Sequence, residues 1–516
     1  MSHPTYDVAI VGYGPAGQVA AALLGQRGFK VYVCERLLDV YQIPRAISLD
    51  HEILRVFQQL GVVDAIEPYT EPFTNSEYFG VDGQLIRRMT MVAPPYPQGY
   101  TPSVVFTQPP VERALRAHVA TLPNVTVQLG VEMRELAQDA DGVTLRIDAD
   151  GETHTVRARY AIACDGASSA VRTQLGIEME DLDFDEPWLV VDVLVNDQGL
   201  AKLPAVSVQY CEPERPCTLV IGPKNHRRWE ISILPGEDPK EVATPEQTWK
   251  LLSRWLTPED GELWRQASYR FHALVAREWR QGRVFLAGDA AHMQPPFLGQ
   301  GMCQGIRDVA NLGWKLAAVM QGEVRGEAAD ALLDSYGIER RAHVRELTSR
   351  IKGVGAVICE RDVDKARARD ASLLEACGGV VRDTPRQDVL PRLEGGLLSA
   401  HASAARGSLF PQPWLGRSME ERRRMDEIAG NGWRLVLAPG VAAPAAASAP
   451  ALTVVAIRRA EDLDGVATTW FERHACAAAL VRPDNYVFGV AAGEDDIAAL
   501  WDEAAAALGH AACAPA

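Results

Sequence analysis

The sequence predicts a mixed α/β protein in which a nucleotide-binding βαβ unit is combined with an inserted antiparallel sheet. Two patterns carry this prediction. From Tyr6 to Glu35, a short β-branched strand, a glycine turn, an alanine- and leucine-rich helix and a second strand follow one another, which is the order of a βαβ unit. From Trp188 to Leu234, runs that alternate apolar and polar residues are bounded by proline and glycine, as antiparallel strands are.

The composition is that of a packed globular protein with two or three domains: 516 residues, 47% apolar and 23% charged. The formal net charge of -16 disfavours nucleic acid and anionic membranes as partners, because both are bound by basic surfaces. The nine cysteines stand without a CxxC pair or metal-ligand spacing. We therefore expect reduced thiols, no metal site and a cytoplasmic location, with neither a signal peptide nor a membrane span.

The first motif is Gly12-Tyr13-Gly14-Pro15-Ala16-Gly17, which lies between the first strand and its helix. Glycine at these positions lets the backbone turn and approach a pyrophosphate at the helix N-terminus. Glu35, at the end of the second strand, is placed to accept hydrogen bonds from ribose hydroxyls. This segment predicts a dinucleotide site and leaves both NAD and FAD open.

Two later segments place an aspartate at the end of a strand. Cys164-Asp165-Gly166 closes an apolar strand, a pattern that also fits a routine turn with a serine cap. Gly288-Asp289-Ala290-Ala291-His292 follows a strand and continues through Pro295-Pro296-Phe297-Leu298-Gly299-Gln300-Gly301-Met302 into a helix predicted over 303–320. An aspartate here can bind a ribityl hydroxyl, and the helix start can place N–H groups against a flavin that becomes anionic on reduction.

Taken in order, the three segments resemble those of the flavoprotein aromatic hydroxylases of the para-hydroxybenzoate hydroxylase and phenol hydroxylase type. The likeness is greatest to the 3-(3-hydroxyphenyl)propionate hydroxylases, and it is strongest over 5–60 and 280–345. It includes Pro44-Arg45-Ala46-Ile47 and, near the end, Leu480-Val481-Arg482-Pro483-Asp484. The resemblance therefore covers most of the chain.

The resemblance implies four parts. They are a Rossmann-like FAD-binding domain (1–73, 98–180 and 277–360), an antiparallel-sheet substrate domain (74–97 and 181–276), a helical segment with a linker (361–440), and a thioredoxin-like C-terminal domain (441–516). Structural support or a homodimer contact is the expected role of the last part.

The resemblance also implies which residues hold FAD. They are Gly12, Gly14, Pro15, Ala16, Gly17, Glu35, Arg36, Arg45, Gln108, Asp165, Gly166, Gly288, Asp289, Gly299, Gln300, Gly301 and Met302. Asp165 is associated in this family with NAD(P)H as well. Cys303 stands where many relatives carry asparagine, which leaves in doubt the contacts that the asparagine side chain makes.

The implied reaction inserts one oxygen atom of O2 into the ring of a phenolic acid such as 3-(3-hydroxyphenyl)propionate, in aromatic catabolism. NADH or NADPH reduces the flavin, O2 forms a C4a-hydroperoxyflavin, and the terminal oxygen goes to a ring carbon ortho or para to the hydroxyl. The sequence holds no second βαβ unit with a glycine fingerprint. NAD(P)H is therefore expected to bind transiently between the domains.

Such a reaction needs a dry cavity and a hydrogen-bond acceptor or base near the phenol. Pro296 is expected in the wall beside the flavin. Candidates for the acceptor are His51, Tyr210, His226, Tyr269 and His272, each with packing or capping as its ordinary alternative. Arg45, Arg228 and Arg270 could pair a substrate carboxylate, and a solvated surface role is the alternative for the last two.

Other functions fit parts of the pattern. A polyketide-tailoring hydroxylase would share every flavin segment and differ in the size of its substrate cavity. A flavin-binding regulator without turnover is the alternative from another class. A flavin halogenase is disfavoured, because the eleven tryptophans include no Trp-x-Trp motif.

Overall fold

The computed structural model describes residues 6–149, 151–443 and 452–510. Its first sheet has the strand order β17-β18-β11-β1-β2-β8, with β9 and β10 attached through β11. The parallel strands are β18 (Val284–Leu286), β11 (Glu152–Ala163), β1 (Tyr6–Val11), β2 (Val31–Glu35) and β8 (Val125–Leu129). This sheet confirms the βαβ unit that the first 35 residues predict.

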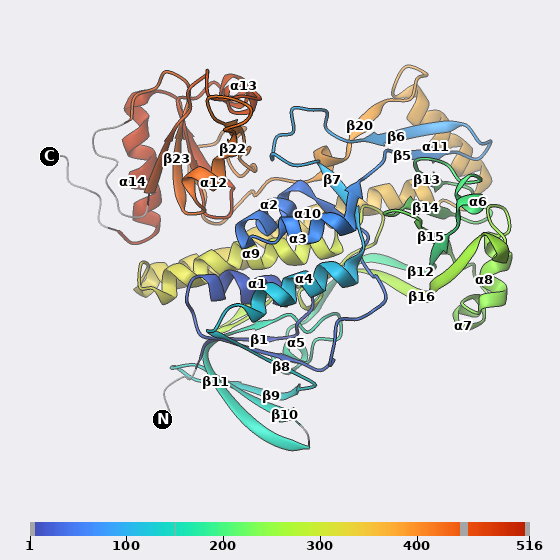
Figure 1. Cartoon of the computed structure of the whole chain (residues 1–516), viewed down its shortest axis with the longest axis horizontal. Coiled ribbons are helices and arrows are strands. Elements are labelled where there is room, and N and C mark those ends of the chain that lie inside the picture. Colours follow the sequence, from blue (N-terminus) through green and yellow to red (C-terminus); the bar gives the residue numbers. More distant parts are fainter. Residues whose placement is uncertain (1–5, 150, 444–451, 511–516) are drawn as a thin grey trace.

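Apolar side chains cover both faces of this sheet, which explains why its central strands read as continuous β-branched runs. Val8, Ile10 and Val33 are fully buried. Two helices, α1 (Pro15–Gln26) and α9 (Gly301–Met320), pack together above the sheet (Figure 1). The antiparallel meander on the other side consists of β9 (Glu132–Gln138), β10 (Val143–Ala149) and the start of β11.

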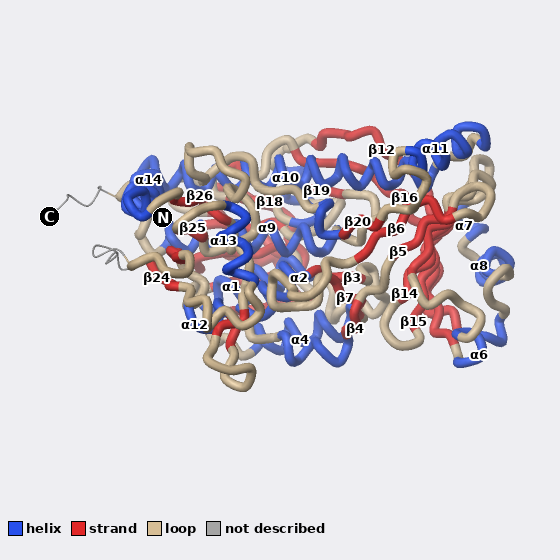
Figure 2. Tube along the Cα trace, turned by 90° about the horizontal axis from the view of Figure 1, so that it is seen from above, coloured by secondary structure: helices blue, strands red, loops and turns tan. Residues whose placement is uncertain are grey.

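The second sheet has nine strands in the order β19-β16-β12-β15-β14-β13-β5-β6-β20. It lies at the opposite end of the molecule from α13 and α14 (Figure 2). Its strands are β5 (Ser76–Phe79), β6 (Leu85–Thr90), β12 (Met179–Val195), β13 (Ser207–Tyr210), β14 (Cys217–Ile221), β15 (His226–Ser232), β16 (Gly261–Ala276), β19 (His292–Met293) and β20 (Asp383–Pro385). The sequence predicts strands over 189–195, 206–210 and 229–234, which correspond to the second half of β12, to β13 and to most of β15. It does not predict the other six strands of this sheet.

One face of the second sheet is apolar, and it packs against short helices. Leu219, Trp229 and Ile231 are buried there with Leu252 of α8 (Pro245–Leu252). Because side chains alternate along a strand, the residues between them face the first domain. This alternation brings Thr218, Arg228 and Glu230 to that inner face.

The remaining elements connect the sheets and cover their edges. They are β3 (Ser48–Asp50), α2 (His51–Leu60), α3 (Val63–Ile66), β4 (Thr70–Pro72), β7 (Ser103–Phe106), α4 (Gln108–Ala120), α5 (Ala170–Gln174), α6 (Asp197–Leu200), α7 (Pro239–Val242), β17 (Arg280–Gln281), α10 (Gly326–Cys359), β21 (Trp414–Leu415) and β22 (Arg423–Arg424). The sequence pattern over 104–119 predicts one helix, but the helix begins at Gln108, because residues 103–106 pair with β3 as a strand.

Residues 361–440 contain less helix than the sequence predicts for this charged segment. The structure forms α11 (Val363–Glu375) and the short α12 (Met425–Ala429) there. Between them the chain mostly runs through turns and extended connections, where Pro385, Pro391, Pro411 and Pro413 interrupt any helical run. The helix prediction for the middle of this segment is wrong for that reason.

The C-terminal unit contains a four-stranded sheet in the order β24-β23-β25-β26. Its elements are β23 (Trp433–Leu437), β24 (Leu452–Ala456), α13 (Val466–His474), β25 (Ala478–Val481), β26 (Val487–Ala491) and α14 (Ile497–Ala507). This order fits the thioredoxin-like arrangement that the sequence predicts. Because β23 is a central strand, the sheet reaches N-terminal to residue 441. The alanine- and proline-rich composition of residues 442–451 predicts a linker, and this segment lies mostly outside the described residues.

A buried ion cluster joins the C-terminal unit to α9 and α10. Arg482 donates to Oε1 and Oε2 of Glu339 at 2.9 and 2.7 Å, and Lys315 donates to Oε2 at 2.8 Å. Burial tends to raise the pKa of the Glu339 carboxyl, but Arg482 and Lys315 outweigh it and lower that pKa to about 2. The ionised form of Glu339 is thus strongly favoured, and the cluster holds the unit against the first domain.

No helix within the described part of the chain is long and apolar enough to cross a membrane.

The substitution Arg482→Met should lower the free energy of unfolding by about 3–5 kcal/mol, because it leaves the Glu339 and Asp484 carboxylates buried with too little positive charge. Urea unfolding followed by tryptophan fluorescence measures this. Arg458→Met is the matched control, since Arg458 forms an exposed pair with Glu461 and should change the same quantity by less than about 1 kcal/mol. If Arg482→Met and Arg458→Met lowered the free energy of unfolding by the same amount, that result would contradict the structural role of the cluster.

Candidate active site

In the glycine turn after β1, close packing requires glycine at two positions, and the third glycine has open space around it. A Cβ on Gly12, whose φ is +98°, would meet the carbonyl oxygen of Cys164 at 2.3 Å, and a Cβ on Gly17 would meet the oxygen of Gly12 at 2.1 Å. A Cβ on Gly14 would meet no atom of the described residues within 4 Å. The backbone at Gly14 therefore borders free space at the N-terminus of α1, as a pyrophosphate site requires.

The acid that we predict for the ribose lies beside this turn. Glu35 ends β2, and its Oε2 accepts a hydrogen bond from the Tyr13 N–H at 2.7 Å. Its Oε1 accepts from the Leu37 N–H at 2.9 Å. These bonds fix the carboxylate at the rim of a recess of about 200 Å³, and each oxygen keeps a lone pair for a hydroxyl.

Asp165 supplies a buried oxygen without a partner in the described residues. Its Oδ2 accepts from the Val171 N–H at 3.1 Å, whereas its Oδ1 has no hydrogen bond. Burial raises the pKa of this carboxyl. An orphaned buried acceptor is costly in a native protein, so its position in the same recess fits a ligand that brings a hydroxyl donor.

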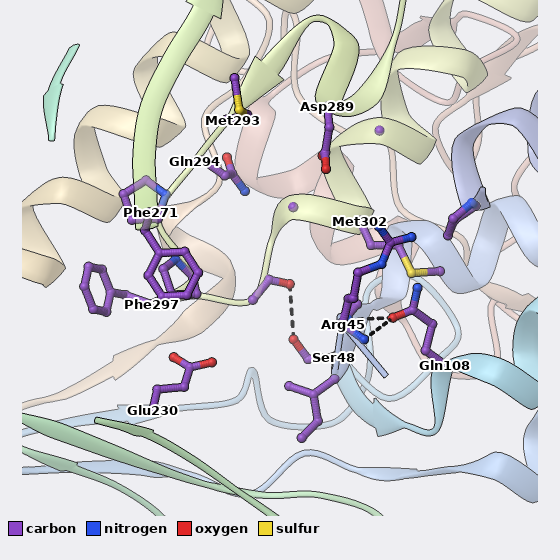
Figure 3. Close-up of a pocket in the computed structure, with 18 of the residues that line it drawn as sticks. Arg45, Ser48, Gln108, Glu230, Phe271, Asp289, Met293, Gln294, Phe297 and Met302 are labelled. Carbon is purple, nitrogen blue, oxygen red and sulfur yellow. Dashed lines mark hydrogen bonds between the residues drawn. The ribbon is translucent and has the colours of Figure 1, made fainter. Parts of the chain in front are cut away.

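The recess continues into a larger cavity of about 390 Å³ between the two sheets. Gly14, Arg45, Cys164 and Gly166 line both spaces, so the two form one elongated groove. Asp289 faces the cavity without a hydrogen bond to any described residue, and Gly301 and Met302 bring the N-terminus of α9 to its wall. Figure 3 shows Asp289, Met302 and Arg45 around this end of the cavity.

Most of the residues that we predict for FAD meet along this groove. Those that line it are Gly12, Gly14, Pro15, Ala16, Glu35, Arg36, Arg45, Gln108, Asp165, Gly166, Gly288, Asp289, Gly299, Gly301 and Met302. Gly17 acts through close packing instead. Gln300 is not among the lining residues, and its side-chain Oε1 accepts from Arg307 at 2.9 Å.

Gln108 has a positioning role that the sequence does not reveal. Its Oε1 accepts hydrogen bonds from the N–H groups of Arg45 and Ala46 at 2.7 and 2.6 Å, as Figure 3 shows. Its amide nitrogen donates to Glu112 Oε1 at 2.8 Å. Gln108 therefore fixes the connection before β3 that carries Arg45 across the groove.

The second sheet supplies the floor of the cavity, and this floor is polar. Ser76, Ser207, Gln209, Thr218 and Glu230 line it. Apolar side chains lie above it, and they include Phe73, Phe271, Phe297 and Pro296. An aromatic ring with polar substituents suits such a space, since apolar walls exclude water and a few placed polar groups orient the ligand.

Of the six catalytic candidates from the sequence, the structure brings Pro296 and His272 to the cavity. His51, Tyr210, His226 and Tyr269 do not line it. Tyr210 accepts from Trp255 Nε1 at 3.0 Å among the apolar side chains of the outer face. His226 Nε2 lies 2.7 Å from Asp192 Oδ1, and burial lowers the pKa of this histidine.

The other two candidates are held by their own surroundings. His51 begins α2, and burial lowers its pKa to about 4, which favours the neutral ring at physiological pH. The Tyr269 ring lies under the guanidinium of Arg265, with 4.7 Å between guanidinium carbon and ring centroid.

The three arginines that we predict for a substrate carboxylate all line the cavity, but two already have acid partners. Arg228 donates to both oxygens of Asp192 at 2.7 and 3.1 Å and to the carbonyl of Pro44 at 3.0 Å. Arg270 pairs with Asp185 and is largely exposed. Arg45 has no acid within salt-bridge distance among the described residues, and its guanidinium lies over Tyr41.

Sequence reasoning missed Glu230, Gln209, Thr218 and Arg386 as cavity residues. The signal for Glu230 was present, because Arg228 and Glu230 alternate with the apolar Trp229 and Ile231 in a single strand, which marks two different faces. No local signal marks Arg386, which reaches the cavity from the segment after β20. Among the described residues, no group of three or more His, Cys, Asp or Glu side chains could hold a metal ion.

Comparison with known proteins extends these observations over the whole chain. A family model described as "FAD binding domain" matches residues 5–351, and one described as "HcaD C-terminal domain" matches residues 407–507. A probable NADH-specific resorcinol 4-hydroxylase of Rhodococcus jostii (strain RHA1) is 38% identical over 97% of this chain and 95% of its own length. A 3-(3-hydroxy-phenyl)propionate/3-hydroxycinnamic acid hydroxylase of Mycobacterium sp. (strain JLS) is 34% identical over 94% of this chain and 89% of its own.

Solved structures show the same fold. The flavin-dependent monooxygenase PieE, in complex with FAD and substrate, superposes with a TM-score of 0.82 at 23% identity, covering 98% of this chain and 100% of that one. Aklavinone-11 hydroxylase superposes with a TM-score of 0.79 at 24% identity, covering 98% and 99%. The mixed α/β architecture with its two large sheets is therefore that of known FAD-dependent hydroxylases.

The substitution Gly14→Ala should leave the fold intact and remove most of the bound FAD. The backbone at Gly14 has φ −74°, which alanine adopts freely, but the new Cβ would occupy the space beside the pyrophosphate. FAD absorbance per protein and the circular dichroism spectrum measure the two effects. Gly353→Ala is the matched control, because Gly353 also has open space around its Cβ position and lies on α10, and it should retain full FAD. Full occupancy in Gly14→Ala would count against the predicted pyrophosphate position.

Proposed function

We propose that this chain, which belongs to the FAD binding domain family of flavin-dependent aromatic hydroxylases, hydroxylates a single-ring phenol that carries a second substituent meta to its hydroxyl. The named relatives support the ring size and the substitution. One is named for resorcinol and the other for 3-(3-hydroxy-phenyl)propionate, and both compounds are meta-substituted phenols. NADH is the proposed electron donor, since the first relative is named NADH-specific.

The observation that carries this proposal is the polar floor of the cavity opposite the flavin end. When bound, FAD takes up electrons from the reduced nicotinamide and supplies the place where O2 is activated. The chain's own residues exclude water and orient the substrate. Phe271, Phe297 and Pro296 exclude water from the space beside the ring, and the floor turns the polar edge of the substrate toward the sheet.

One buried cation supports a phenolic acid such as 3-(3-hydroxyphenyl)propionate. Arg386 lines the cavity and is largely buried. Its guanidinium donates to the carbonyl of Leu298 and lies 4.6 Å from the centroid of the Phe73 ring. No carboxylate of the described residues lies within salt-bridge distance of it, so a carboxylate on the substrate would give it a charged partner.

Resorcinol is the second candidate, and the same floor favours it. Gln209, Thr218, Ser76 and Ser207 offer uncharged hydrogen-bonding groups, which suit a second hydroxyl as well as a carboxylate side chain. The two candidates differ in whether Arg386 pairs with the substrate.

We place the reaction in the cytoplasm. The cysteines of the described residues are all free thiols, which supports a reducing compartment. A homodimer stays a prediction of the sequence alone.

Purified FAD-loaded protein should oxidise NADH at least about tenfold faster when 3-(3-hydroxyphenyl)propionate or resorcinol is present, because binding of the correct substrate assembles the reactive arrangement. Product analysis by chromatography, together with H2O2 measurement, gives the share of NADH that ends in hydroxylation. NADPH and unsubstituted benzene serve as controls. NADH oxidation that no phenol accelerates, with all electrons recovered in H2O2, would contradict the proposed function.

A further inference from the structure

Glu230 is a buried acid that lines the cavity. The residue is 7% exposed, and it lies on β15 among the lining residues of the floor. Neither carboxylate oxygen forms a hydrogen bond or salt bridge with any other described residue. Figure 3 shows Glu230 on the opposite side of the pocket from Asp289.

The charged neighbours of Glu230 are committed elsewhere. On its own strand, Arg228 is bonded to Asp192 of β12. Arg265 of β16 lies 3.5 Å from Asp192 and donates to the Pro44 carbonyl. Burial raises the pKa of the Glu230 carboxyl, with Arg228 and Arg265 lowering it and Asp192 raising it. The Glu230 carboxylate is therefore more basic than an exposed one, and no residue that the structure describes donates a hydrogen bond to it.

The residues beside Glu230 form a row across neighbouring strands. Glu230 pairs in register with Thr218 of β14, and Thr218 pairs with Gln209 of β13. The Thr218 hydroxyl donates to Gln209 Oε1, so it cannot also donate its single proton to Glu230. Within this row, the Glu230 carboxylate therefore receives no hydrogen bond, and the amide nitrogen of Gln209 donates none.

The unpaired Glu230 carboxylate needs a hydrogen-bond donor from the ligand. Leaving a buried acceptor unpaired costs free energy, and leaving a charged one costs more. Water can occupy this position before the substrate binds, but the reaction requires a dry site when the substrate is bound. The group that replaces water must be an O–H or N–H donor on an otherwise apolar ring.

We propose that Glu230 accepts the hydrogen bond of the phenolic hydroxyl of the substrate and is the acceptor that activates the ring. This inference rests on the proposed function. The phenol proton stays between its oxygen and a Glu230 Oε atom, which raises electron density at the ring carbons ortho and para to the hydroxyl. The hydroxyl edge of the ring then faces the sheet, and the carbon to be hydroxylated faces the flavin end.

The test compares ligands that differ only in the hydroxyl proton. One pair is 3-(3-hydroxyphenyl)propionate with its methyl ether, and the other is resorcinol with 1,3-dimethoxybenzene. The dissociation constants are measured without NADH, from the change that each ligand causes in the absorbance of the bound FAD. Wild type should bind the hydroxyl compound about 10- to 100-fold more tightly in the pair that contains its substrate, as a hydrogen bond to a charged acceptor provides.

Glu230→Gln should reduce this preference to less than about threefold and lower the share of NADH that ends in product. Glu262→Gln is the matched control, because Glu262 is an exposed acid of the same sheet, and it should keep the wild-type preference. Glu230→Asp keeps the charge but withdraws it by one methylene, and it should give an intermediate preference. If Glu230→Gln does not fold, as judged by circular dichroism and FAD content, Glu230→Asp is compared with wild type in the same way.

Two results would overturn the role of Glu230: a wild-type protein that binds phenol and ether equally well, or a Glu230 variant that keeps the full preference. A wild-type protein that neither binds nor hydroxylates any of these phenols contradicts the proposed function itself. The two failures are therefore distinguishable.

Discussion

The carboxylate of Asp308 connects the parts of the chain that meet at the cavity. Its Oδ2 accepts a hydrogen bond from the Gly288 N–H at 2.9 Å and lies 2.8 Å from His292 Nε2. Its Oδ1 accepts from Arg340 Nε at 2.9 Å. One fully buried side chain on α9 thus holds the turn that presents Asp289, the start of the loop that carries Pro296, and the long helix α10.

The electrostatics of this contact favour the ionised acid. Burial tends to raise the pKa of Asp308, but His292 and Arg340 outweigh it and lower the pKa. A carboxyl whose pKa is depressed by folding stabilises the native state above its unfolded pKa, and this contribution is lost as the pH falls through the folded pKa. At neutral pH the contact is therefore fully present.

The flavin half of the site could be predicted from the sequence because each of its segments is local. The glycine turn, Asp165 and Asp289 each follow a strand directly, so their place at the carboxyl edge of a parallel sheet follows from chain order. The substrate half could not be predicted in this way. Arg228 is neutralised by Asp192, 36 residues away, and held by Pro44, 184 residues away. Only the folded chain shows that Glu230 has no such partner within the described part of the sequence.

The account depends on Asp308 ordering the flavin end of the cavity, and the affinity for FAD tests this most directly. FAD titration of the apoprotein, followed by flavin fluorescence, should show that Asp308→Asn weakens FAD binding by at least about tenfold, since a charged hydrogen bond contributes roughly 1.5–3 kcal/mol. Asp334→Asn, at an exposed acid paired with Arg280, should bind FAD as wild type does. An Asp308→Asn protein that binds FAD with wild-type affinity would contradict the account.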